Sequence, residues 1–262
     1  MILPLALSSA VIAVTLLYAS VLDIRERRVP FRTWYPMLAI TIPLVLWFYG
    51  MVLIADGWQP AVYFLAMTGI FCFIFYFFAY FHFFGGADAW ALIFICISIP
   101  TFPFMPISGY PPHNFFPFSV LVNAVIINLA TPAGIYVMNI FKGNHAPFPY
   151  KFLGFPVEGD KIGRSYGYIM EEIHDDEGRL NRRFIRTGEA LKSMVKGEKR
   201  IYTKNLRLHP EDYREEIALY RRAGKVWISY GVPFMIPILI GVFFALFIGD
   251  ILVIIMKSLM GV

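Results

Sequence analysis

Residues 2–22 at the amino terminus read ILPLALSSAVIAVTLLYASVL, and residues 23–30 follow as DIRERRVP. An α-helix needs ~20 apolar residues to cross a hydrocarbon core of ~30 Å. The first run has about that length, and its arginines come after it. A cleaved secretory signal carries its cations before the apolar run. We therefore interpret residues 2–22 as a retained transmembrane helix whose amino terminus lies outside.

Similar apolar runs recur along the chain, at residues 33–55, 61–84, 89–107, 117–141 and 226–256. The sequence is 58% hydrophobic and 16% charged, with a mean hydropathy of +0.62, whereas soluble domains carry ~25% charged residues. The expected fold is therefore predominantly α: a polytopic membrane protein with six transmembrane helices. The fourth helix has the least defined boundary, because its run is short and ends among prolines.

Lys and Arg residues are distributed unevenly between the loops. Of the 23 in the chain, four lie in residues 24–32 and eighteen in residues 142–225. Cytoplasmic loops are rich in these residues. The asymmetry predicts a multi-pass protein of the cell (plasma) membrane, with both termini outside and residues 142–225 in the cytoplasm. It also explains the net charge of +5 without nucleic-acid binding.

The polar segment 142–225 is expected to be a small α+β cytoplasmic domain inserted before the last helix. The chain then divides into three parts. Residues 1–141 hold five transmembrane helices together with Asp23 and Asp88, residues 142–225 form the polar domain, and residues 226–262 hold the sixth helix. Asp175-Asp176-Glu177-Gly178 predicts a hairpin turn. His209-Pro210-Glu211-Asp212 predicts the start of a helix that continues to Arg222.

Carboxylates beside the apolar helices need an explanation, because ionisable groups in or near a bilayer are costly and often functional. Asp23 and Asp88 stand at the ends of two predicted helices, on the same predicted membrane face. Gly85 and Gly86 precede Asp88, and glycine permits a tight turn, close backbone approach and movement of this loop. We interpret Asp250, late in the last helix, as structural. The acids outside the polar segment are Asp23, Glu26, Asp56, Asp88 and Asp250.

Two interpretations of Asp23 and Asp88 remain open from the residues alone. Each could cap a helix or bind neighbouring arginines. As a pair they suit peptide hydrolysis, in which an ionised carboxylate takes a proton from water and a protonated one polarises the scissile carbonyl. Two like charges close together favour the sharing of one proton.

Asp23, the basic stretch with Val29-Pro30, and Gly85-Gly86-Ala87-Asp88 resemble the motifs of archaeal preflagellin peptidases, within the type IV prepilin peptidase family of GxGD aspartyl proteases. Ala87 stands in a less usual place for that motif. The resemblance implies that Asp23 and Asp88 are catalytic. It also implies that the substrates are preflagellins or prepilin-like proteins, which lose a short cationic leader at the cytoplasmic face.

Bacterial relatives often add a cytoplasmic cysteine cluster that binds zinc, and many also methylate the new amino terminus. This chain has only Cys72 and Cys96, both within apolar runs. We therefore expect no metal, no cofactor and no methyltransferase activity.

An acidic run in the polar segment is a further candidate site, because it could receive the cationic leader. A solvated hairpin face would explain these residues equally well. The run comprises Glu171, Glu172, Asp175, Asp176 and Glu177.

The main competing function is a proton- or cation-coupled transporter, since intramembrane acids also form ion pathways. It predicts acids near the bilayer midplane and paired discontinuous helices. A membrane scaffold that binds partners through residues 142–225 is a third interpretation, and it leaves Asp23 and Asp88 unexplained.

Overall fold

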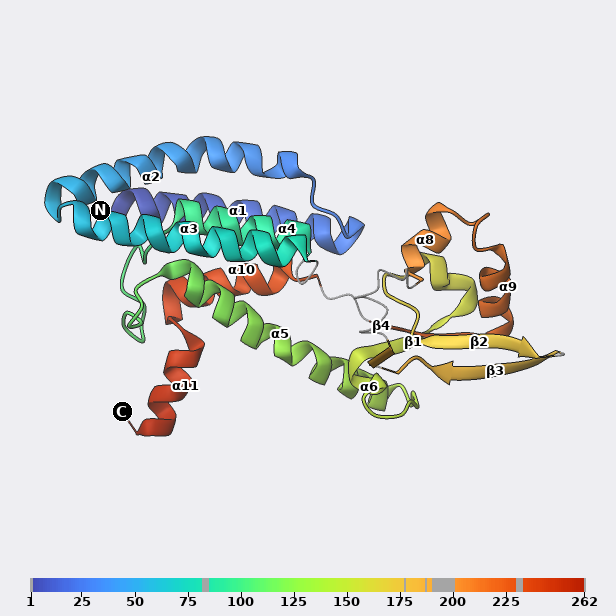
Figure 1. Ribbon diagram of the computed structural model, residues 1–262. Helices are drawn as coiled ribbons and strands as arrows, with labels where there is room; N and C mark the ends of the chain where they lie inside the picture. Colours follow the sequence, from blue (N-terminus) through green and yellow to red (C-terminus); the bar gives the residue numbers. More distant parts are fainter. Residues whose placement is uncertain are drawn as a thin grey trace. The chain divides into compact units, whose positions relative to one another are not determined.

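Figure 1 shows the computed structural model, which describes residues 2–81, 85–176, 178–186, 188–189, 201–229 and 233–261. The chain folds into two compact units. The first, which we call the helical unit, contains Met1–Leu129 and Pro233–Val262. The second, the polar unit, is Ala130–Val232 and is wider than the predicted segment 142–225.

Four helical segments are long and apolar enough to cross a membrane. They are α1 (Ile2–Glu26), η1 (Phe31–Trp34) continuing into α2 (Tyr35–Ala55), α3 (Trp58–Tyr80) and α5 (Phe116–Phe141). A fifth candidate is the bent pair that consists of α10 (Met235–Phe243) with the π-helical η3 (Phe244–Ile248), followed by α11 (Ile251–Met260). The described residues therefore confirm a mostly helical fold with four or five candidate spans, where the sequence predicted six.

The fourth predicted span differs most from expectation. Helix α4 (Gly86–Ser98) has 13 residues, which reach ~20 Å at 1.5 Å per residue. That length falls short of a ~30 Å hydrocarbon core. Prolines follow at positions 100, 103 and 106, and proline cannot donate the backbone hydrogen bond that a helix needs. The apolar run therefore continues beyond α4 without a helix through residue 107.

The last predicted apolar run, residues 226–256, contains both a strand and a broken helix. Its first residues belong to β4 (Lys225–Ser229), and α10 begins at Met235. A buried strand and a buried helix can have the same hydropathy, so the run itself does not separate them.

The break between η3 and α11 is a polar elbow centred on Gly249 and Asp250. Gly249 has a φ of +120°, a value that residues with a side chain rarely adopt. Asp250 is 2% exposed, and its carboxylate accepts hydrogen bonds from Val253 N (3.2 Å) and Ser119 Oγ (2.8 Å). Asn123 bonds the backbone of residues 249 and 251 on both sides of the break. Asp250 therefore caps α11, which agrees with its structural interpretation.

Helices α1, α4 and α10 contact one another inside the helical unit, and α3 packs against α4. Figure 1 shows α1, α3 and α4 running side by side. Their shared core is apolar and includes Ile12, Leu16, Leu92, Phe116 and Met235. This packing brings the end of α1 and the beginnings of α4 and α10 together.

The polar unit is a small α+β fold, as predicted. Strands β1 (Gly154–Glu158) and β4 pair antiparallel, as do β2 (Glu171–Asp176) and β3 (Arg179–Phe184). Isolated bridges join residue 169 to residue 228 and residue 168 to residue 202. The helical elements are α6 (Tyr150–Leu153), η2 (Gly159–Arg164), α8 (Thr203–Leu208) and α9 (Arg214–Ala223).

Two local predictions in the polar unit had different outcomes. The hairpin is confirmed: β2 and β3 pair across a turn in which Gly178 has a φ of +88°. The helix predicted from His209 is α9, which begins later, at Arg214. Residues 210–213 form turns instead, and Asp212 N bonds His209 O at 3.1 Å.

Candidate active site

Asp23 lies in the last turn of α1 and is half-buried. The buried face of that helix includes Ile12, Leu16 and Ala19. Steps of three and four residues keep side chains on one helix face, and the next step of four reaches Asp23. The helix ends just after it, where Arg27 has a φ of +52° and its N–H bonds Asp23 O at 3.0 Å. The sequence of α1 therefore turns this carboxyl towards the protein interior.

Two groups stabilise the Asp23 carboxylate. The backbone N–H of Met235, the first residue of α10, lies near enough to interact favourably with it, and the charge of Arg27 acts on it. The first N–H groups of any helix lack partners inside the helix and suit an anion. The amino terminus of α10 therefore lies beside the Asp23 carboxyl group.

Asp88 occupies the first turn of α4, and its side chain folds back over Gly85. A Cβ atom on residue 85 would lie 2.6 Å from Asp88 Oδ2, whereas one on Gly86 would meet nothing within 4 Å. Gly85 has a φ of −60° and a ψ of 139°, which any residue can adopt. Gly85 therefore lies in close contact with the Asp88 carboxylate, as predicted, because glycine has no Cβ to occupy that space. Movement of the loop at Gly85 and Gly86 stays a prediction.

The carboxyl groups of Asp23 and Asp88 are near enough to interact electrostatically. They come from α1 and α4, which pack directly against each other. Ala87, the remaining motif residue, is partly buried against the apolar core. The structure thus brings together the two aspartates that the sequence singled out.

An aromatic cluster fixes the chain between α1 and α2 against α4. Phe31 meets Trp90 edge to face at 5.1 Å, and Trp34 lies 5.6 Å from Phe94. Trp34 is 1% exposed, and Trp90 stands two residues after Asp88. Aromatic pairs of this kind contribute ~0.5–1.5 kcal/mol beyond their buried area. The basic stretch 25–32 is thereby held beside the site.

The sequence analysis missed Met235 and this aromatic cluster. The Trp90–Phe94 spacing of four residues on α4 was a usable signal, because such residues share a helix face. The group of Met235 that faces Asp23 is its backbone N–H, which every residue except proline has, so residue type could not indicate its role.

The acidic run of the polar unit is largely compensated by arginines. Glu171 Oε2 also accepts the Trp227 N–H at 3.0 Å, and the Arg222 guanidinium bound to Asp175 lowers the pKa of that carboxyl. Asp176 is exposed, and Glu177 lies outside the described residues. The ion pairs are Glu171–Arg182 (2.8 Å), Glu172–Arg183 (2.7 Å) and Asp175–Arg222. These pairs reduce the charge available for a cationic leader.

Metal binding has no obvious place in the part of the chain that the structure describes. No three His, Cys, Asp or Glu side chains there are grouped so that they could hold an ion.

A multi-pass membrane fold with two interacting aspartates at adjacent helix ends fits the class of membrane aspartyl proteases. Two family models match the sequence: the type IV leader peptidase family over residues 10–134, and the archaeal peptidase A24 C-terminus type II over residues 146–251. The chain belongs to the type IV leader peptidase family, peptidase A24, and carries its archaeal type II carboxy-terminal domain. Peptidases of this family process type IV prepilin-like leader sequences. No curated protein matches the sequence.

Proposed function

We propose that this protein is an endopeptidase that removes the short cationic leader from preflagellin or prepilin-like substrates, with Asp23 and Asp88 as its catalytic residues. The observation that carries the proposal is the meeting of these two carboxyl groups where α1, α4 and α10 converge. Family membership supports the same reaction.

The proposed reaction needs one ionised and one protonated aspartate. The ionised carboxylate takes a proton from water, and the resulting hydroxide attacks the scissile carbonyl carbon while the protonated carboxyl gives its proton to the carbonyl oxygen. Collapse of this tetrahedral intermediate returns that proton to one aspartate, and the other passes its proton to the leaving amine as the C–N bond breaks. The N–H of Met235, at the amino terminus of α10, faces the Asp23 carboxyl group during these transfers.

A pH–rate profile tests the shared proton. Two interacting carboxyl groups titrate as a pair with two macroscopic ionisations. The proposal therefore predicts two ionisations in both kcat and kcat/KM. A profile without them would count against the paired mechanism.

The proposed topology follows the charge distribution. Residues 24–32, 85–88 and 142–225 lie in the cytoplasm, and both termini lie outside the cell membrane. This orientation requires six crossings, so α4 and the apolar residues that follow it, through residue 107, cross the membrane together. The positive-inside rule supports this orientation, because 22 of the 23 Lys and Arg residues then face the cytoplasm.

Cleavage by the purified protein tests the reaction. A preflagellin with its leader is incubated with the protein in liposomes, and the products are identified by mass spectrometry. Asp23→Asn and Asp88→Asn should each abolish cleavage. Glu26→Gln is the matched control, since it removes a carboxylate from the same helix end, where Glu26 is exposed. Near-normal cleavage by either aspartate variant would contradict the proposal.

A further inference from the structure

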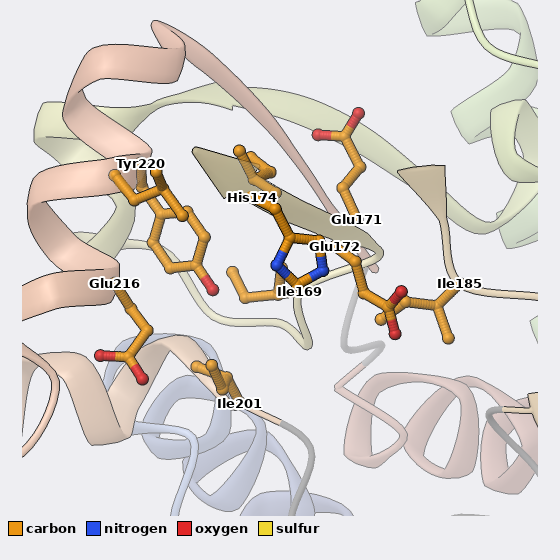
Figure 2. Close-up of a pocket in the computed structure, with 10 residues that line it drawn as sticks. Ile169, Glu171, Glu172, His174, Ile185, Ile201, Glu216 and Tyr220 are labelled. Atoms are coloured by element: carbon orange, nitrogen blue, oxygen red, sulfur yellow. The ribbon is translucent and has the colours of Figure 1, made fainter. Parts of the chain in front are cut away.

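A cavity of about 210 Å³ lies within the polar unit, between β2 and α9. Figure 2 shows side chains of both elements that line it, among them His174, Glu216 and Tyr220. Its walls are mostly apolar, although three glutamates, a histidine and a tyrosine also line it. The lining residues are Ile169, Glu171, Glu172, Ile173, His174, Ile185, Ile201, Glu216, Leu219 and Tyr220.

The Tyr220 hydroxyl points into this cavity (Figure 2). The residue is only 4% exposed, and its hydroxyl has no hydrogen-bond partner among the residues that the structure describes. Burial, with a smaller effect of the Glu216 charge, raises the pKa of Tyr220 to about 12. The hydroxyl oxygen is open to the cavity, so it can form a hydrogen bond there. A ligand in the cavity would satisfy it.

Glu216 stands one helical turn before Tyr220 on α9, so both residues are on the helix face that lines the cavity. It is half-buried. The other two lining glutamates bind Arg182 and Arg183, whereas Glu216 has no cationic partner within the described ranges. The cavity therefore combines an uncompensated carboxylate with apolar walls.

We propose that this cavity binds a lysine or arginine side chain of the substrate's leader, an inference that rests on the proposed function. These side chains bury an apolar stem and keep a charged head among polar groups. Ile169, Ile185 and Leu219 contact the stem. The carboxylate of Glu216 binds the head, and the Tyr220 hydroxyl accepts a hydrogen bond from it. Glu171 and Glu172 of the acidic run also line this cavity, but the proposal places the charged head at Glu216, which has no arginine partner within the described ranges.

Binding of a synthetic leader peptide to the full-length protein tests the proposal. The protein is placed in nanodiscs of neutral lipid and carries Asp23→Asn, so that the peptide stays intact. One peptide contains lysine, and the other has norleucine, which keeps the stem and loses the ammonium group. Fluorescence anisotropy gives both dissociation constants for each variant.

Loss of the ammonium group should weaken binding about five- to tenfold, as expected for a partly buried charge pair. Glu216→Gln should weaken lysine-peptide binding by a similar factor and leave the norleucine peptide unaffected. Tyr220→Phe should weaken the lysine peptide about threefold. Glu211→Gln is the control, because Glu211 is exposed and already binds Arg214. An unchanged preference for lysine in both Glu216→Gln and Tyr220→Phe would overturn the proposal.

Cleavage kinetics of the same variants with Asp23 intact distinguish a failure of this proposal from a failure of the proposed function. Glu216-dependent binding without cleavage would support the cavity and contradict the peptidase assignment of the site. Cleavage that depends on Asp23 and Asp88, with an unchanged KM in Glu216→Gln, would support the function and overturn the cavity. The supporting result is a higher KM with an unchanged kcat.

Discussion

Substitution of Gly85 by alanine should displace the Asp88 carboxylate and lower activity while it changes the stability of the fold very little. The added Cβ would lie 2.6 Å from Asp88 Oδ2 and 3.5 Å from its Cγ. Real Cβ contacts stay beyond about 3 Å, so the carboxylate must move by several tenths of an ångström or rotate away. Since this atom is the free end of a side chain, the free energy of unfolding should fall by less than ~1 kcal/mol. Displacement of a reacting group by ~1 Å can lower a rate ~10²-fold.

The assay compares kcat/KM for leader cleavage and the unfolding temperature of Gly85→Ala with those of Gly86→Ala. A Cβ at position 86 meets nothing within 4 Å, and alanine favours the first turn of a helix over glycine by up to ~1 kcal/mol. We expect a loss of about 10- to 100-fold for Gly85→Ala and near-normal activity for Gly86→Ala. Normal cleavage by Gly85→Ala, or equal losses in both variants, would refute this reasoning.

Three further predictions concern groups outside the aspartate pair. Asp250→Ala should lower the free energy of unfolding by ~2 kcal/mol in denaturant titrations while the amount of protein in the membrane fraction stays constant, because it removes a cap and a buried acceptor; no change would contradict that role. Glu216→Gln should lower the pKa of Tyr220 from about 12 in ring-labelled NMR titrations, since a nearby negative charge disappears. This pKa is raised above the ordinary value near 10. The contribution of Tyr220 to the free energy of unfolding is therefore complete below pH ~10 and is lost as pH rises through 12. Arg222→Gln should raise the pKa of Asp175 towards its ordinary value in carboxyl NMR titrations, since the guanidinium lowers it. The contribution of this ion pair to the free energy of unfolding is present above the ordinary pKa and is lost as pH falls through the lowered pKa. An unchanged pKa in the variant would contradict the ion pair.

Hydropathy located most of the helices because each apolar run had to be buried in lipid or protein. It gave the positions of α1, α3 and α5 within a few residues. It failed at residues 226–229, where a buried strand has the same apolar composition as a helix. It also extended the fourth span through prolines that end α4.

The candidate site could also be predicted in part from the sequence. The distribution of Lys and Arg between the loops predicted that Asp23 and Asp88 share one membrane face, and the interaction of their carboxyl groups agrees with that prediction. The approach of Met235 to Asp23 depends on how α10 packs against α1. Cross-strand arginines beside Glu171 and Glu172 depend on the hairpin register. Such pairings follow from tertiary contacts, which sequence patterns do not specify.

The most direct test of the account is the cleavage rate of Asp23→Asn, Asp88→Asn and the double variant, measured in one preparation with one leader-bearing substrate. Groups that act as a unit show strongly non-additive losses. If the two aspartates act as one catalytic pair, each single variant should lose ~10³-fold or more in kcat, and the double variant should be hardly slower than either. A single variant within tenfold of the natural protein, or losses that multiply in the double variant, would contradict a catalytic pair formed by these two aspartates.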